Sequence, residues 1–535
     1  MLMVETMFTH PRILADTGAA NATPAETGTD AILVSDGIIT AVGGRHELRE
    51  RAPHASEVPL PGRAVVAGFH DAHIHLGSVA RSLSALDLRD CASLAEALGR
   101  VREYLVAHPG AGWVVGGRYD SNRWSSGVPT RHDLDAVCAD RPIALASLDG
   151  HSAWLNTAGL RAAGIDRNTP DPVGGDIARE ADGREPAGVV RESISDEVRE
   201  LSERGMDPEL PRLLRAAQDI VLAQGITHVT DLDEGATRRA LSGLRDSGAL
   251  KIRVHKGIPM SDLDVAIEAG WRTGDGDRWL TVGPVKLFSD GALGSHSAHM
   301  GEDFADAPGN VGIEVLRCEE LAALVGRANR AGIAVATHAI GDRANRLVLD
   351  AYAEHVELTR AMGLRNRVEH AQHIALEDLP RFRALGVVAS LQATHCTTDY
   401  ALAAQRIGQR RLANYAWRSL LDSGAALAFG SDAPIEPTPP MFGVHAAVTR
   451  QDRTGEPLGG FEPHERLSVR EALSAYSAGA AYAAGLEHRV GRIAPGQYAD
   501  FVALTDDPTA IDPTALASVT SAATVIDGDV AFVRE

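Results

Sequence analysis

Residues 68–76, GFHDAHIHL, place two histidines at the end of a run of apolar and β-branched residues. The run Ala64–Phe69 has the composition of a buried strand. In an extended segment, residues two apart share a face, so His73 and His75 are expected to point to the same side. A single pair of this kind is more often hydrogen-bonded structure than a metal site. Its meaning depends on the strands that follow.

Seven further strand candidates follow, and amphipathic helical stretches separate the later ones. This alternation is typical of βα units around a parallel sheet. The eight strand candidates are Ala64–Phe69, Ile226–Asp231, Lys251–Lys256, Pro284–Phe288, Ile333–His338, Asn366–His370, Val387–Gln392 and Ala426–Gly430. A capping box at Ser468 and Glu471 opens a helix after the eighth. Eight strands with helices between them predict an α/β fold, a (β/α)8 TIM barrel.

The two ends of the chain have a different pattern, with short strands broken by turns. Apolar runs flank Asp36-Gly37 near one end and Asp527-Gly528 near the other, and both are hairpin signals. We predict a small β-sandwich domain built from residues 1–64 and 490–535, which encloses a barrel of residues 65–489. Two unrelated terminal hairpins are the alternative.

The first two strand candidates are separated by residues 70–225, far more than a helix and two loops need. Residues 78–211 contain strand-like runs of their own, WVVGGRY and PIALASL, and a capping box at Ser93 and Glu96. Loops after barrel strands lie on the catalytic face. We therefore predict that residues 78–211 form an inserted α+β subdomain that roofs the active site.

Composition excludes several classes of protein. The 535 residues are 44% hydrophobic and 23% charged, as in ordinary globular proteins, and the net charge of −20 disfavours nucleic acid. No window of 18 consecutive apolar residues occurs, and the amino terminus has no secretory pattern, so we expect neither membrane insertion nor export. Four scattered cysteines fit a reducing compartment, the cytoplasm. A homodimer is the default assembly.

Metal-ligand side chains recur at the carboxyl ends of the strand candidates. Lys286 lies in the fourth strand, His338 ends the fifth, His370 ends the sixth, and Asp432 follows the eighth. A single histidine here would be structural, and Asp432 could be a helix N-cap. Together with the histidine pair of the first strand, however, the set favours a metal site, because imidazole and carboxylate suit zinc and other divalent first-row metals.

At this point the chain resembles the amidohydrolase superfamily over nearly its whole length. Within it, the chain is similar to the amidohydrolase-3 branch, with its YtcJ-like and N-substituted formamide deformylase-like members. The phrases that carry the resemblance are GFHDAHIHL, DGHSAWLN, GITHVTD, VKLFSDGALGS, ATHAIGD, RVEHAQ, QATHCTTD, FGSDAP and GRIAPGQYADFV. One departure is His296-Ser297, where an arginine is expected; it concerns substrate recognition and leaves the metal ligands intact.

The resemblance implies two divalent metal ions, with zinc as the first choice. The first-strand pair, His73 and His75, would hold one ion, and the histidines of the fifth and sixth strands would hold the other. Lys286 would bridge them as an N-carboxylate; the alternative is a salt-bridged or substrate-binding lysine beside a single metal. Asp432 would take a proton from the metal-bound water as hydroxide attacks the substrate, and pass it to the leaving nitrogen. Asp71 either orients a histidine or is a turn residue.

Five residues are candidate substrate contacts. His151 and Trp154 would face the pocket by family likeness, although a satisfied histidine and a core tryptophan are equal alternatives. Asp290 and Ser295, in the glycine-flanked loop after the fourth strand, suit a polar contact or a mobile lid. His395 lies near the mouth by its position after the seventh strand.

The leading hypothesis is an amidohydrolase that cleaves a C–N bond, other than a peptide bond, in an amide-like small molecule. A mononuclear deaminase of the same fold is disfavoured by Lys286 and by the lack of a glutamate after the fifth strand. Ester, lactone or carbamate hydrolysis stays open, since it uses the same attack on a carbonyl. A non-catalytic scaffold of this fold is the reading from another class, and the complete ligand set argues against it.

Overall fold

The computed structural model describes residues 5–15, 29–121, 124–148, 152–172, 175–205, 207–233 and 235–535. The chain divides into two compact units, one of residues 1–76 with 218–535 and the other of residues 77–217. In the part of the chain that is described, no helix is both long and apolar enough to cross a membrane.

An eight-stranded parallel sheet forms the centre of the larger unit, in the order β21-β19-β17-β16-β15-β14-β13-β6. Its strands are β6 (Phe69–Ile74), β13 (Ile226–Asp231), β14 (Arg253–Pro259), β15 (Leu280–Phe288), β16 (Val335–Ala339), β17 (Arg367–His370), β19 (Val388–Leu391) and β21 (Ala426–Phe429). The segments after the first and last strands are joined by hydrogen bonds from Asp432 N to His73 O (2.7 Å) and from His75 N to Ala433 O (2.9 Å). This brings the two edges of the sheet together, and the fold is the predicted TIM barrel.

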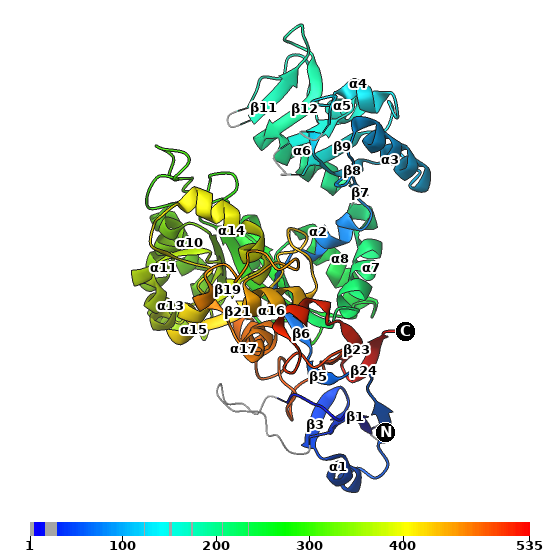
Figure 1. The fold of residues 1–535 in the computed structure, drawn as a ribbon, viewed down its shortest axis with the longest axis vertical. Helices are drawn as coiled ribbons and strands as arrows, with labels where there is room; N and C mark the ends of the chain where they lie inside the picture. Colours follow the sequence, from blue (N-terminus) through cyan, green and yellow to red (C-terminus); the bar gives the residue numbers. More distant parts are fainter. Residues whose placement is uncertain are drawn as a thin grey trace. The chain divides into compact units, whose positions relative to one another are not determined.

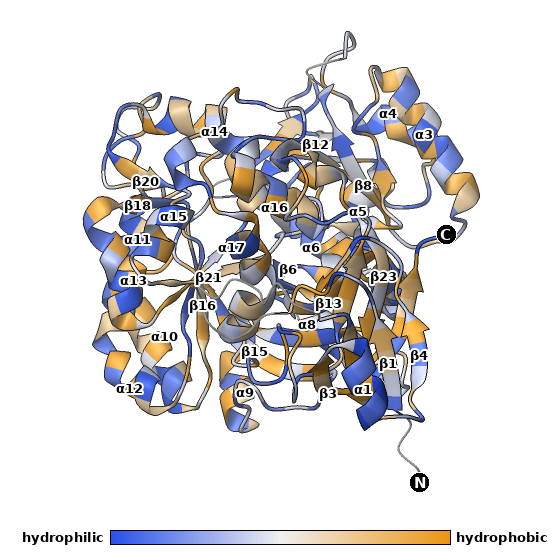
Figure 2. Ribbon diagram, turned by 60° about the horizontal axis from the view of Figure 1, so that its bottom comes forward, coloured by the Kyte–Doolittle hydropathy of each residue, from blue (hydrophilic) through white to orange (hydrophobic). Residues whose placement is uncertain are grey.

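Helices follow the strands and lie around the barrel (Figure 1). They are α8 (Gly235–Asp246), α9 (Leu263–Glu268), α10 (Cys318–Arg330), α11 (Asp342–Glu354), α12 (Val356–Ala361), α13 (Leu379–Leu385), α14 (Ala393–Ile407), α15 (Trp417–Asp422), α16 (Pro440–Thr449), α17 (Val469–Ser474) and α18 (Ala480–Ala483). Figure 2 shows hydrophilic and hydrophobic residues mixed along α11 and α13, as expected of helices with one buried face. The predicted capping box of Ser468 and Glu471 opens α17.

Two four-stranded sheets, built from both ends of the chain, form the predicted β-sandwich. One has the order β3-β2-β1-β4 and the other β24-β23-β22-β5. The strands are β1 (Glu5–Thr9), β2 (Ala31–Ser35), β3 (Ile38–Gly43), β4 (Ser56–Pro59), β5 (Ala64–Ala67), β22 (Phe501–Leu504), β23 (Ser521–Ile526) and β24 (Asp529–Val533). Phe8 and Phe501 lie in the shared core, with ring centroids 5.1 Å apart. Both predicted turns form, with positive φ at Asp36-Gly37 and Asp527-Gly528.

The first barrel strand differs from its prediction. The run Ala64–Phe69 divides at Gly68: β5 pairs with β22 in the terminal sheet, whereas β6 pairs with β13 in the barrel. Gly68 N donates to Asp500 O at 3.0 Å, and a Cβ at this position would lie 2.3 Å from Thr227 Oγ1. The chain passes from one sheet to the other at a point where a side chain does not fit.

The smaller unit is an α+β unit with a six-stranded mixed sheet, β11-β12-β10-β9-β8-β7. Its strands are β7 (Leu86–Asp87), β8 (Val114–Tyr119), β9 (Ile143–Ser147), β10 (Ser152–Leu155), β11 (Gly175–Arg179) and β12 (Pro186–Glu192). Its helices include α3 (Leu94–Ala107), α4 (Arg131–Asp135), α5 (Thr157–Ala162) and α6 (Ser193–Arg204). Ser93 caps α3 by accepting a hydrogen bond from Glu96 N. The unit has its own apolar core, which includes Leu145 and Trp154.

A buried ion pair ties the barrel to the terminal sheets. Arg253 donates to both carboxylate oxygens of Asp500, at 2.8 and 3.0 Å, and to Asp527 at 3.0 Å.

We expect Arg253→Ala to lower the free energy of unfolding by about 3–5 kcal/mol, because it leaves a buried carboxylate without its partner. Denaturant unfolding measures this loss. The exposed Arg245–Asp246 pair is the control, since Arg245→Ala should cost at most about 1 kcal/mol; equal losses in the two variants would contradict the expectation.

Candidate metal centre

Three of the predicted ligands meet at the carboxyl end of the barrel. His73, in β6, and His75, just after it, each place Nε2 3.3 Å from Asp432 Oδ1. Asp432 follows β21, so its position next to the histidines depends on the closure of the sheet. The three side chains offer ligand atoms close enough together to hold one metal ion. We name His73, His75 and Asp432 the first metal position.

A second group shares the same aspartate. His370 ends β17, His395 lies in the first turn of α14, and both offer a ligand atom close to those of Asp432. His395 Nε2 lies 3.6 Å from Asp432 Oδ2. The imidazole rings of His370 and His395 stack, with their centroids 5.9 Å apart. We name His370, His395 and Asp432 the second metal position. We predicted His395 as a substrate contact; the structure brings it close to Asp432, and its substrate role stays a prediction.

His338 and Lys286 lie beside the second position. The ring centroid of His338 is 4.5 Å from that of His370, and His338 Nε2 lies 3.1 Å from Gly291 O. If Nε2 carries the proton and donates to this carbonyl, the lone pair of His338 is on Nδ1. Lys286 is buried, with Nζ 4.9 Å from the centroid of the Phe288 ring.

Two observations, besides the types of residue present, support a metal ion at this group of side chains. The Nε2 atoms of His73 and His395 are buried and have no hydrogen-bond partner within the described residues, although both point towards Asp432. His370 and Asp432 adopt positive φ, 72° and 59°. Backbone strain of about 1–3 kcal/mol at a non-glycine residue persists only where the surroundings enforce it, and such residues gather at functional sites.

Burial and charge set the protonation states of the site. Burial lowers the pKa of His338 to about 3 and holds that of His370 well below its usual value. Both are therefore neutral at pH 7, the form that binds a metal. Burial opposes the charged form of His75 as well, but the carboxylates of Asp233 and Asp432 raise its pKa to about 10. A metal at the first position must displace that proton.

The environment of Lys286 differs from that of the other buried lysine in the barrel. Lys256 is paired with Asp231 at 2.9 Å, whereas Lys286 forms no ion pair with any residue that the structure describes. Burial lowers the pKa of Lys286 to about 8, although Glu369 and Asp432 oppose the shift. At neutral pH, the uncharged amine is therefore a larger fraction of Lys286 than of an ordinary, exposed lysine.

Polar residues near the site that are not ligands hold its backbone. Asp71, in the first strand, accepts hydrogen bonds from His73 N (3.1 Å) and from Ser431 N (2.9 Å) after the last strand, and among the described residues no imidazole donates to it. Asp290 is buried and accepts backbone N–H groups of the loop after β15 and of the segment after β16, including Gly341 N at 2.8 Å. Ser295 bonds within its own exposed loop, to Ser297. Asp290 and Ser295 thus have local partners, and their substrate roles stay predictions.

The two candidates from the insertion have different outcomes. His151 lies outside the described residues. Trp154, in β10, is fully buried in the core of its unit, and its indole N–H donates to Thr130 O at 2.8 Å. It also packs edge-to-face against Tyr119 and Trp124. These contacts fit the core tryptophan that the sequence left open, so we do not retain Trp154 as a substrate contact.

Four partners of the histidines were missed at the sequence level. Each accepts from or donates to the Nδ1 atom of an imidazole in the site, and they are Glu369, Asp233, Gln392 and Gln372. Two of them could have been found from their positions in the sequence, since Glu369 directly precedes the predicted ligand His370 and Asp233 follows the second strand. The other two are amides in loops, a residue type with no pattern of its own.

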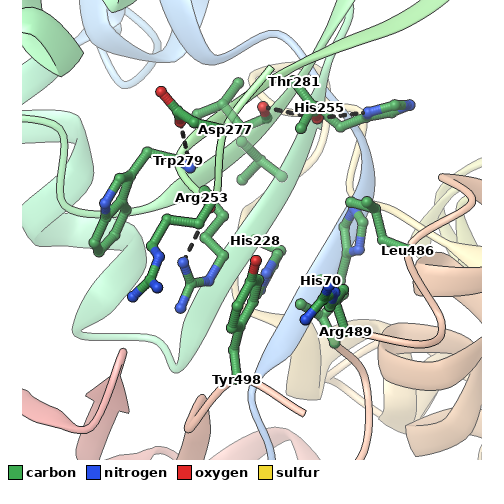
Figure 3. Close-up of a pocket in the computed structure, with 14 residues that line it drawn as sticks. His70, His228, Arg253, His255, Asp277, Trp279, Thr281, Leu486, Arg489 and Tyr498 are labelled. Atoms are coloured by element: carbon green, nitrogen blue, oxygen red, sulfur yellow. Dashed lines mark hydrogen bonds between the residues drawn. The ribbon is translucent and has the colours of Figure 1, made fainter. Parts of the chain in front are cut away.

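A separate cavity of about 50 Å³ lies near the amino ends of the strands; His70, the second residue of β6, and Arg253, the first residue of β14, line it. Figure 3 shows its lining, which includes His228 and Tyr498; the guanidinium carbon of Arg253 lies 4.1 Å from the centroid of the Tyr498 ring. None of the predicted metal ligands lines it. Its main cation, Arg253, is paired with Asp500 and Asp527, so we do not assign the chemistry to this cavity.

Known proteins are similar to this chain over almost its full length. The chain is 32% identical to YtcJ of Bacillus subtilis over 514 residues, 94% of this chain and 96% of YtcJ. It is 29% identical to N-substituted formamide deformylase of Arthrobacter pascens, over 94% of this chain and 95% of that protein. The crystal structure of a metal-dependent hydrolase from Pyrococcus furiosus matches with a TM-score of 0.80 and 27% identity, over 94% of this chain and 100% of the other.

The family match and the similarity to a metal-dependent hydrolase of the same fold show that the chain is a metal-dependent hydrolase. More narrowly, the chain belongs to the Amidohydrolase family, whose profile matches residues 57–532. The predicted amidohydrolase-3 branch is thereby confirmed.

Proposed function

We propose that the protein hydrolyses a C–N bond, other than a peptide bond, in an amide-like small molecule, with two divalent metal ions as cofactors. The observation that carries the proposal is the position of Asp432, whose two carboxylate oxygens face two separate groups of imidazole nitrogens. One carboxylate between two histidine groups suits a pair of cations. Zinc is the first choice because imidazole and carboxylate are its usual ligands.

The first metal position would hold one ion, and the second position, with His338 next to it, would hold the other. Lys286 and His338 lie on the neighbouring strands β15 and β16, where Phe288 is paired with His338. Besides burial, the charge of Lys286 lowers the pKa of His338, and the carboxylate of Asp432 acts to raise the pKa of Lys286. As an N-carboxylate it would supply two anionic oxygens as a bridge. A carbamate forms from the uncharged amine, and burial in this barrel increases the share of that form.

When bound, the metals would lower the pKa of a water molecule and polarise the substrate carbonyl. The protein's own contribution is to hold the reacting groups and move the proton. Asp432 is the group placed to accept a proton at one oxygen and to return it to the leaving nitrogen. Its backbone is fixed by the hydrogen bond from Asp432 N to His73 O, and its Oδ atoms by the surrounding imidazoles.

The C–N bond is supported by the relative whose name states its reaction, N-substituted formamide deformylase. Ester, lactone and carbamate hydrolysis remain second candidates, because the same groups would serve them. We also propose a cytoplasmic location, since all four cysteines are free. A homodimer stays a prediction.

Removal of the metal tests the proposed function. We expect the wild-type protein to hydrolyse members of a panel of N-substituted formamides, acetamides and matched esters, and a chelator to lower the rate by about 10³-fold or more, since several kcal/mol of transition-state stabilisation is lost. Added Zn²⁺ should restore the rate. Hydrolysis that survives complete removal of metal would contradict the proposal, and cleavage of the esters alone would favour the second candidates.

A further inference from the structure

Both histidines of the first metal position have a carboxylate on the ring nitrogen that faces away from Asp432. His73 Nδ1 lies 2.6 Å from Glu369 Oε2, and both side chains are fully buried. His75 Nδ1 lies 3.3 Å from Asp233 Oδ1, and Asp233 is also buried. In each case Nδ1–H donates to the carboxylate, so Nε2 is the ring nitrogen that faces the metal position.

A cation holds the carboxylate of Glu369, and another cation holds the backbone of Asp233. Arg367 donates to both oxygens of Glu369, with Nη2 3.0 Å from Oε2, and the same Nη2 donates to Ser390 Oγ at 2.9 Å. Lys256 donates to the backbone carbonyl of Asp233. Since Arg367 is itself buried, Glu369 is the anion that its guanidinium requires.

The histidines of the second metal position have neutral partners instead. His370 Nδ1 donates to the amide oxygen of Gln392 at 2.8 Å. Gln372 Nε2 donates to His395 Nδ1 at 3.1 Å, so the proton of a neutral His395 is on Nε2, and a metal at that atom must displace it. Both amides orient a ring, but neither brings negative charge to it. The carboxylate near this group, Asp290, lies 3.5 Å from His338 Nε2 and accepts backbone N–H groups, including Gly341 N at 2.8 Å.

This contrast has a direct consequence for a bound cation. A carboxylate hydrogen-bonded to a ligand imidazole fixes the tautomer and makes the ring a stronger donor, and its charge also attracts a divalent ion. A neutral amide provides only the orientation. We infer that the two metal positions differ in affinity by construction, that the first is tight and the second labile, and that Glu369 and Asp233 are the positioning residues that set the difference. The inference rests on the proposed function, because it requires two metal ions.

Stepwise removal of zinc from the zinc-loaded full-length protein tests the inference. Samples are dialysed against increasing concentrations of a zinc chelator, and zinc per chain is counted by elemental analysis. We expect the wild type to lose zinc in two steps, with the first ion released at a chelator concentration at least about 10-fold below that for the second. A single step that releases both ions together would overturn the inference.

Two variants identify which position is which. Glu369→Gln should shift only the tight step, by about 10–100-fold, the usual effect of removing a partner of a metal ligand. Gln392→Ala, the matched variant at the second position, should shift only the labile step. A general loss of structure would shift both steps in each variant, so the selectivity separates positioning from folding. Because Glu369→Gln leaves Arg367 without its anion, Asp233→Asn serves as an independent variant with the same expected result.

The outcomes also separate this inference from the proposed function. Two ions that leave in one step would overturn the inference and leave the proposed function standing. A shift of the labile step by Glu369→Gln and Asp233→Asn would overturn it as well. A wild-type protein that binds no zinc, even when zinc is supplied in excess, would overturn both.

Discussion

Replacement of Asp432 by asparagine is expected to lower kcat/KM by about 10²–10⁴-fold, the contribution of a positioned group that transfers protons. Asp432 is the residue that belongs to both metal positions, so its charge serves two groups of imidazoles and the proton transfer together. Asparagine tolerates positive φ, and the backbone at this position has φ 59°. The variant therefore tests the carboxylate and leaves the backbone conformation in place.

Steady-state kinetics on the best substrate of the amide panel measure the effect, with zinc in excess so that weakened binding does not mask it. Asp422→Asn is the control, since this exposed aspartate pairs with Arg418 on α15, away from the metal positions. The control should keep the wild-type rate. A variant at Asp432 that retains more than about a tenth of the activity would show that this carboxylate does not move the proton.

Replacement of Lys286 by alanine is expected to remove one of two metal ions and to lower kcat by about 10²–10³-fold, a loss of several kcal/mol of transition-state stabilisation. Without the N-carboxylate, the second position loses an anionic ligand, and its neutral partners Gln392 and Gln372 do not replace the charge. The first position retains His73, His75 and Asp432.

Metal content and kinetics together measure this effect. Lys251→Ala is the control, because Lys251 is exposed and lies outside the site. A Lys286→Ala protein that keeps both ions and full activity would remove the bridge from the account, and a mononuclear site would then replace it.

Much of the fold could be predicted because each barrel strand is a short apolar run with a local signature. Ile226–Asp231 has the predicted bounds, and the other later strands overlap their predicted runs. The first strand was the exception. The run Ala64–Phe69 is continuous in hydropathy, and nothing local shows that Gly68 marks a change of sheet. The space for a side chain at Gly68 is taken by Thr227, which lies far away in sequence.

The metal ligands could be predicted because they stand at matching ends of strands, and a barrel brings such ends together. The residues that hydrogen-bond to these ligands could not be predicted from the sequence. His73 and Glu369 are separated by 296 positions, so only the folded barrel reveals the contact. His395 was placed near the mouth by position, but its closeness to Asp432 depends on how α14 begins. Trp154 has a motif that suits a pocket, yet its neighbours Tyr119 and Trp124 make it part of a core.

The central claim is that this barrel holds two metal ions around Asp432. The most direct test is elemental analysis of the wild-type protein, purified without chelator after growth with added zinc, beside Lys286→Ala. The account predicts close to two divalent ions per chain in the wild type and close to one in the variant. A wild type that carries no metal would contradict it.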